Sequence, residues 1–225
     1  MKKFISIIFA FCLCFSVGTT AFASTYQTTS SINLSNANEK FAQMTNEQLN
    51  NYIDSVQKSS KMTLDSTNYL GSTTASIKLA WLAAAQIARN MGYPCAAKMV
   101  ECSVNNESYI ENSDIFSRKI DDSSVYKNYL SSARSQKYTD NSIVFTKGDD
   151  SDLFYALHKV DIKTTGVLLG TELATYTVEI TDRFNFNLDN NYDSLFTGTV
   201  NNWAWLCQQT SVLHDIFVSI TFYDK

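Results

Sequence analysis

Hydrophobic residues recur at helical spacing early in the chain. Leu49, Tyr52, Ile53 and Val56 follow one another at intervals of three and four positions and form one apolar stripe on a helix. Residues 45–48 (Thr-Asn-Glu-Gln) fit a capping box, in which the Thr and Gln side chains each bond the backbone amide of the other residue. The pattern therefore predicts a helix that begins at this box.

A second helix is predicted over residues 74–90, because residues 77–85 are apolar on nearly all sides of a helix. A helix of this kind is buried, and Gly92 is suited to end it. Pro94 is suited to the first position of a third helix, where its missing N–H costs no hydrogen bond. Shorter helices are expected over residues 114–120 and 124–133.

Beyond Asp140 the pattern changes, and β-branched and aromatic residues become frequent. Apolar and polar residues alternate around Val178 and again around Val218, which is typical of antiparallel strands with one covered face. Strands are expected over residues 142–146, 152–163, 175–186 and 215–223, with a helix over residues 200–213.

These elements predict an α+β protein in which helices cover one face of a mostly antiparallel sheet, with the order β-β-α-β in its second half. We expect residues 45–225 to form a single domain that is helical over residues 45–134 and sheet-rich over residues 140–225. Residues 24–44 are rich in Ser, Thr, Asn and Gln, and are predicted to be a flexible lead-in.

Residues 1–23 have the anatomy of a secretory signal peptide. Lys2 and Lys3 precede an apolar run over residues 4–17, and residues 21–23 (Ala-Phe-Ala) supply the small-residue cleavage signal. The run is shorter than the roughly 20 residues of a membrane-spanning helix, and no later stretch is long and apolar enough to span a bilayer. We therefore expect cleavage after Ala23 and a secreted, extracellular product.

Composition and charge narrow the classes of partner. The chain has 225 residues, 44% of them hydrophobic and 18% charged, with a formal net charge of −4 and no basic run. A mildly acidic chain without a basic cluster lacks the electrostatic footprint of a nucleic-acid-binding protein. We expect a folded protein with no nucleic-acid partner.

Three cysteines remain once the signal peptide is removed, namely Cys95, Cys102 and Cys207. Cys95 and Cys102 are two turns apart on one predicted helix, which is about 10 Å and beyond the reach of a disulfide. A disulfide would therefore join Cys207 to one of them. Alternatively all three are buried thiols. No pair has the spacing of zinc ligands.

His158 and Asp182 are the candidate catalytic residues. The chain has two histidines, and His158 lies on a predicted strand. It would act as a general base if the sheet paired it with a carboxylate such as Asp182. Alternatively, His158 is an ordinary residue at the boundary of the core.

Residues 182–189 form the densest polar cluster near a strand end, with Asp193 beyond them. Carboxylates of Asp182, Asp189 and Asp193 are oxygen ligands of the kind that bind a cation, although the segment lacks the Gly and the terminal Glu of an EF-hand loop. The alternative is a solvated connection whose Asp and Asn side chains turn the backbone. We expect no metal and no cofactor.

Three stretches carry a resemblance to a known family: residues 79–86 (LAWLAAAQ), 152–158 (DLFYALH) and 201–209 (NNWAWLCQQ). They resemble a family of secreted proteins from clostridia and related Gram-positive bacteria, and the likeness extends over most of the chain beyond the signal peptide. The resemblance implies secretion and brings no enzymatic activity with it.

We expect a secreted protein that binds a protein or a component of the cell envelope. The chain holds no assembled catalytic motif, and it is rich in aromatic residues, with 12 Tyr, 14 Phe and 3 Trp, a residue class that anchors interfaces. One alternative is an envelope-targeting hydrolase or toxin that uses His158 and Asp182. A second alternative is a structural protein of a spore or matrix.

Overall fold

The computed structural model describes residues 32–63, 70–133, 138–169, 172–184 and 211–224. The predicted signal peptide, the predicted helix up to residue 210, and Asp189, Asp193 and Cys207 lie outside these ranges. The chain divides into two compact units. The described residues of Tyr93–Asn185 and Asp215–Lys225 belong to one, here called the sheet unit, and those of Lys2–Gly92 and Phe186–His214 to the other, the helical unit.

The described residues contain both helices and a five-stranded mixed sheet, which confirms the predicted α+β class. The helices between Pro94 and Ala133 belong to the sheet unit together with the strands. None of the described helices combines the length and the hydrophobicity that crossing a membrane requires.

In the helical unit, helix α4 (Leu70–Asn90) packs against α2 (Ala37–Ala42) and α3 (Asn46–Thr63). The predicted capping box is present at the start of α3, where the Thr45 amide donates to Gln48 Oε1 at 2.9 Å and the Gln48 amide to Thr45 Oγ1 at 3.2 Å. The predicted apolar stripe of α3 is buried throughout, and so are the apolar residues at the centre of α4.

Helix α2 lies within the segment that was predicted to be a flexible lead-in. Its Phe41 side chain is fully buried and packs against the Tyr52 ring of α3, with 5.3 Å between ring centroids. The prediction missed this helix because the apolar residues Ala37 and Phe41 are too few to stand out among Ser, Thr and Asn. The core of the helical unit therefore begins before Thr45.

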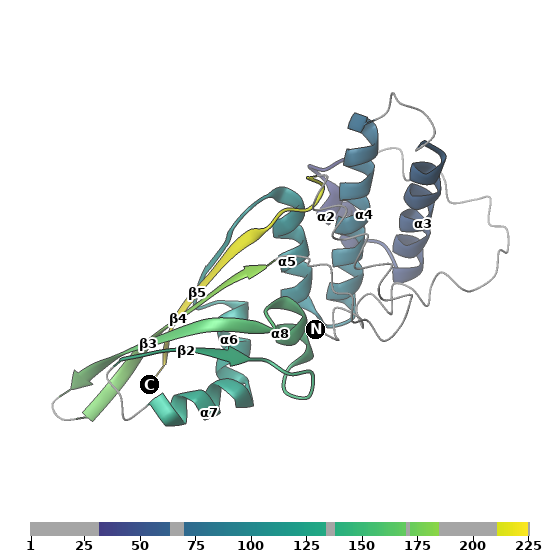
Figure 1. Ribbon diagram of the computed structural model, residues 1–225. Coiled ribbons are helices and arrows are strands. Elements are labelled where there is room, and N and C mark those ends of the chain that lie inside the picture. The colour runs from purple at the N-terminus through teal and green to yellow at the C-terminus, as the bar shows by residue number, and fades with distance from the viewer. Residues whose placement is uncertain (1–31, 64–69, 134–137, 170–171, 185–210, 225) are drawn as a thin grey trace, which may run out of the picture. The chain divides into compact units, whose positions relative to one another are not determined.

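In its described residues the sheet unit combines five strands with four helices. Along the chain these are α5 (Pro94–Asn105), β1 (Tyr109–Asn112), α6 (Ile115–Asp122), α7 (Ser124–Ala133), β2 (Tyr138–Val144), α8 (Ser151–Ala156), β3 (Lys159–Leu169), β4 (Glu172–Phe184) and β5 (Ile216–Asp224). The strand order is β1-β5-β4-β3-β2 (Figure 1). Strand β1 is parallel to β5 and the other three pairings are antiparallel, so the sheet is mostly antiparallel as predicted.

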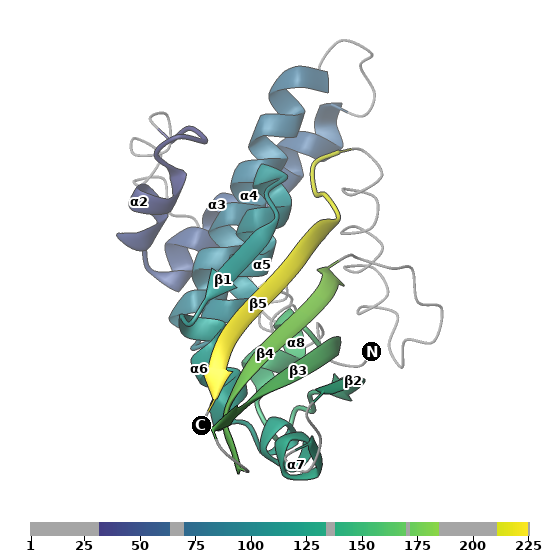
Figure 2. The ribbon, with the colours of Figure 1, turned by 90° about the vertical axis from the view of Figure 1, so that its left-hand side faces the viewer.

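The sheet has two unlike faces. Figure 2 shows helices α5, α6, α7 and α8 on one side of it, and contacts of α6 with β1 and β5 and of α7 with β2 hold them there. We call this side the inner face. Val178, Ile180, Val218 and Ile220 lie on it and are completely buried, while the residues between them point to the opposite, outer face.

One strand prediction was partly wrong, and one strand was missed. Residues 152–156 form most of helix α8 instead of a strand, and β3 begins only at Lys159. The run Leu153–Leu157 is apolar without interruption, so its periodicity did not distinguish a strand from a buried helix. Strand β1 was missed because it has four residues and lies between helices. Residues 211–213, assigned to a helix, form a turn and a bend.

Replacing Ile180 by Ala should lower the free energy of unfolding by about 2–5 kcal/mol, because the side chain is fully buried in the central strand of the sheet. Urea unfolding measures the loss. Glu179→Ala is the matched control on the exposed side of the same strand and should change stability by no more than about 0.5 kcal/mol. Equal effects of the two variants would contradict the assignment of inner and outer faces.

Candidate functional site

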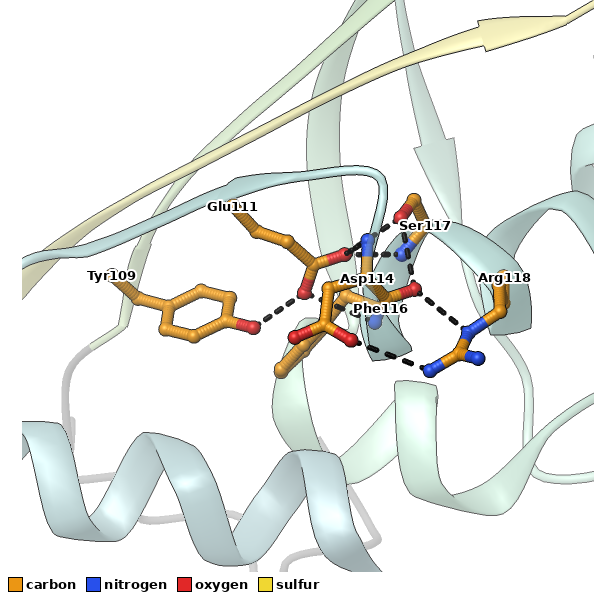
Figure 3. A network of polar contacts seen from close by, with 6 residues as sticks. All are labelled: Tyr109, Glu111, Asp114, Phe116, Ser117 and Arg118. Atoms are coloured by element: carbon orange, nitrogen blue, oxygen red, sulfur yellow. Dashed lines mark hydrogen bonds and ion pairs between the residues drawn. The ribbon is translucent and has the colours of Figure 1, made fainter.

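Glu111, on β1, is a buried carboxylate that accepts several hydrogen bonds (Figure 3). Its Oε1 accepts from the amides of Asp114 and Ser117 at 3.0 and 2.8 Å and from the Ser117 hydroxyl at 2.7 Å. Its Oε2 accepts from the amide of Phe116 at 3.1 Å and from the Tyr109 hydroxyl. Five donors thus converge on one buried carboxylate.

This network caps helix α6. The residue before the helix, Asp114, makes no side-chain cap and instead pairs with Arg118 at 3.3 Å. Burial alone would raise the pKa of Glu111, but the bonds from Ser117, Tyr109 and Phe116 favour the ionised form and bring the pKa below its ordinary value. With both oxygens occupied, Glu111 has a structural role and is not available to a substrate.

A second buried carboxylate, Asp152, caps helix α5 in the same way. Its two oxygens accept from the amides of Cys95 and Ala96 at 3.0 and 2.9 Å, across 57 and 56 positions of sequence. Lys119 of α6 lies 3.3 Å from the same carboxylate and 3.4 Å from Asp150. These charges therefore hold helices together and do not form a free acid–base pair.

Asp182, one of the two predicted catalytic residues, differs in its position from Glu111 and Asp152. It lies on the inner face of β4 opposite Val218 of β5, which is in turn opposite Tyr109 of β1. Continuing the β3–β4 register brings Val160 to its other side, followed by Ile143 of β2. These four neighbours are 8% exposed or less, whereas Asp182 is half-buried. A carboxyl group thus interrupts an apolar row across all five strands.

The environment of Asp182 favours its neutral form. Burial raises its pKa to about 6, and the negative charge of Asp161 adds to this rise. The Arg183 backbone amide donates to Oδ1 at 2.7 Å and opposes the rise. A carboxyl that titrates near neutrality can both give and take a proton. Among the predicted site residues that the structure describes, Asp182 therefore has the environment most typical of a functional acid or base.

His158 is not on a strand, because it lies between α8 and β3 with a left-handed backbone, φ 48°. Its ring packs edge-on against Phe154, with 5.0 Å between centroids, and its backbone carbonyl accepts from Phe145 at 2.7 Å. It precedes Val160, the neighbour of Asp182, by two positions. The predicted pairing of His158 with Asp182 stays a prediction.

Neither cysteine of the described chain is placed for chemistry. Cys95 and Cys102 are free, buried thiols on α5, and burial raises the pKa of both. Within the described residues no three His, Cys, Asp or Glu side chains gather closely enough to hold a metal ion. Of the weak metal candidates, Asp182 has only apolar neighbours in its row, while Asp189 and Asp193 lie outside the described residues.

The outer face of the sheet is polar and exposed, with large apolar side chains on β1 and β5. Ile110 and Tyr223 are each 70% exposed and Phe217 is 49% exposed. Between and beside them lie Thr165, Thr177, Thr181, Ser219 and Thr221, and the charged residues Asp161, Lys163, Glu179 and Arg183. This surface was not predicted from the sequence, although the alternation in residues 216–223 contains four of these twelve residues, namely Phe217, Ser219, Thr221 and Tyr223.

The caps formed by Glu111 and Asp152 were likewise not predicted from the sequence. One signal was present: residues 149–152 (Asp-Asp-Ser-Asp) precede an apolar run, as at the start of a helix. Asp150 does cap α8, accepting from the amides of Asp152 and Leu153 at 2.8 and 2.9 Å. The bonds of Asp152 to α5 and of Glu111 to α6 depend on tertiary structure and have no local signature.

Comparison of the chain with protein-family models, curated proteins and solved structures gives no match. The resemblance to the clostridial family of secreted proteins therefore stays a prediction. What the structure defines is an α+β protein whose sheet has one helix-covered face, interrupted by the half-buried Asp182, and one exposed face.

Replacing Glu111 by Gln should lower the free energy of unfolding by about 2–3 kcal/mol near neutral pH, because charge-assisted hydrogen bonds are lost. Since the folded pKa of Glu111 lies below its ordinary value of 4.5, its contribution is present above that pH and is lost as the pH falls further. Urea unfolding at several pH values measures both effects. Glu107→Gln, at an exposed position, should change neither.

Replacing Asp182 by Asn should have the opposite effect and raise the free energy of unfolding near neutral pH. Because folding raises the pKa from 3.8 to about 6, ionisation of Asp182 opposes folding above this range. Asp182→Asn should therefore be more stable than the unaltered protein by roughly 1–3 kcal/mol at about pH 7.5, and the difference should vanish below about pH 4. Denaturation midpoints across this range provide the measurement. A loss of stability at neutral pH would show that Asp182 is held by a favourable charge partner.

Proposed function

We propose that this protein is secreted and works by binding a protein or a cell-envelope component through the outer face of its sheet. The observation that carries the proposal is the exposure of Ile110, Phe217 and Tyr223 on two adjacent strands. Large apolar side chains exposed on one face of a sheet can mark an interaction site.

The chemistry of this surface favours a partner with both apolar and hydrogen-bonding groups. Phe217 lies opposite Arg183, and Ile110 lies beside Ser219. Hydroxyl side chains on three strands offer donors and acceptors, while the aromatic rings offer contact area with few rotatable bonds. A glycan chain or a protein surface has this combination of groups.

Export is proposed from the sequence of residues 1–23, which lie outside the described part of the structure. The positive start, the apolar run and the small-residue cleavage signal support it. Secretion would bring the outer face of the sheet into contact with the envelope of the producing cell or of its neighbours.

The direct test is sedimentation of the purified protein with washed Gram-positive envelopes. The unaltered protein should appear in the pellet, and Phe217→Ser and Tyr223→Ser should each weaken binding about fivefold or more, since truncation of an interface anchor commonly costs upwards of about 1 kcal/mol. Met91→Ser is the control, because Met91 is 40% exposed and lies in the helical unit.

Two outcomes count against this proposal. If the protein stays in the supernatant when it is mixed with envelopes, and also binds none of the proteins from the same culture, it has no partner among them. Equal binding of the Phe217, Tyr223 and Met91 variants would exclude the outer face as the contact surface. Light scattering that shows ordered oligomers would instead favour the structural role in a spore or matrix.

A secreted envelope hydrolase is the second candidate, and the raised pKa of Asp182 favours it. Mass spectrometry of the supernatant from the same experiment should then reveal soluble fragments that are absent with Asp182→Asn. For the other candidate catalytic residue, His158→Asn is a better variant than His158→Ala, because Asn tolerates the left-handed backbone of His158 more readily than Ala does. Fragments released equally by both variants would exclude these two residues from catalysis.

A further inference from the structure

We propose that strand β2 (Tyr138–Val144), at one edge of the sheet, pairs with β2 of a second copy of this chain, so that two sheets join into one across a two-fold axis. This interface is separate from the outer-face surface and does not depend on envelope binding. The proposal rests on the backbone groups that β2 turns away from the sheet, on the exposure of the strand, and on its complementarity to itself.

The first observation is the direction of the backbone groups of β2. Phe145, which follows the strand in the same register, donates its amide to the His158 carbonyl at 2.7 Å. Backbone bonds of an antiparallel pair alternate along each strand, so Asn141 turns its N–H and C=O toward β3, while Ser142 and Val144 turn theirs away. Among the described residues, the partner of the outward Ser142 amide is the Asn141 side chain, at 2.8 Å.

The second observation is that this edge is open. Figure 2 shows β2 at one end of the strand order. Residues 140–142 are exposed and the Val144 side chain is 43% exposed. The strand has seven residues without proline, glycine or lysine, and its register with β3 contains no bulge. Proteins commonly protect a sheet edge with such devices, and an edge without them is a template for another strand.

The third observation is that β2 is complementary to itself in the antiparallel direction. When Asn141 lies opposite Asn141 of the second copy, the two strands overlap over their full length and Asp140 comes opposite Ser142. Both Asp140 and Ser142 turn their backbone groups outward, so each such pair exchanges two hydrogen bonds. Moving the axis to Asp140 would instead place two carboxylates directly opposite each other, which is unfavourable. The sequence of the strand therefore specifies both the partner and the register.

A two-fold axis closes this assembly at two copies. Each copy contributes the same strand, and the opposite edge of the sheet, β1, has only four residues and offers a shorter template. Edge-to-edge pairing covers neither face, and paired residues keep their side chains on a shared face. The dimer would therefore present two copies of the outer face on the same side.

Analytical ultracentrifugation over a range of protein concentrations should show a monomer–dimer equilibrium. Ser142→Pro removes the outward amide from both copies and should weaken dimerisation about tenfold or more. Ser142→Ala is the matched control, because it keeps the amide and should dimerise like the unaltered protein. The Ser142 amide takes no part in the pairing of β2 with β3, so the proline variant should keep its fold, which circular dichroism checks.

Disulfide mapping tests the register without removing a backbone bond. In the proposed pairing the two Cα atoms of residue 141 lie about 4.5 Å apart, within reach of a disulfide. Those of residue 144 lie about 20 Å apart. With oxidised glutathione, Asn141→Cys should therefore give a covalent dimer on a non-reducing gel, while Val144→Cys and the unaltered protein should not.

A protein that stays monomeric at every concentration, or equal dimerisation of Ser142→Pro and Ser142→Ala, would overturn the proposal. So would oligomers larger than a dimer, or a covalent dimer that forms from Val144→Cys and not from Asn141→Cys. The envelope experiment concerns Phe217 and Tyr223, which none of these variants changes, so its failure and the failure of the dimer are distinguishable.

Discussion

The sheet unit depends on carboxylates that satisfy the exposed amides at the starts of its helices. Helices α5 and α6 have no side-chain cap of their own, and Asp152 and Glu111 supply one from distant elements. The first amides of a helix must be bonded if they are buried, and a carboxylate there also meets the positive end of the helix dipole. Removing either acid would leave several donors unsatisfied at once.

Three aspartates that accept hydrogen bonds from the starts of helices lie in one short segment, residues 149–152. Asp149 accepts from the amide of Ser124 at the start of α7 at 2.8 Å, Asp150 caps α8, and Asp152 caps α5. Lys119 of α6 lies between Asp150 and Asp152. Four helices therefore meet at residues 149–152, and the negative charge gathered there is used for assembly. An acidic cluster of this kind looks functional in a sequence and is structural in the fold.

Asp182 is the opposite case, because its environment in the fold is unusual and the sequence around it does not show this. Along β4 it occupies an apolar position, and its sequence neighbours gave no sign that four buried side chains would surround it. Its selection as a candidate came from the polar cluster that follows it, Asp189 and Asp193 included. The structure gives a different reason for interest, which is desolvation by a row formed from five separate strands.

Local chemistry was the part of the fold that sequence could predict. The capping box at Thr45, Pro94 at the start of α5 and the alternation of β5 each depend on residues a few positions apart, and all three are present. Helix α8 was missed because an unbroken apolar run has no period. The caps of Glu111 and Asp152, like the row around Asp182, arise only when distant segments meet.

The place of β5 in the sheet has a consequence for the order of folding. Residues 216–224 lie between β1 and β4, so the parallel pairing with Tyr109–Asn112 spans more than a hundred positions. Until β5 arrives, β1 has no neighbour and β4 has one free edge. A chain that leaves the ribosome with its N-terminus first therefore cannot complete the pairings of β1 and β4 until residues 216–224 have been made.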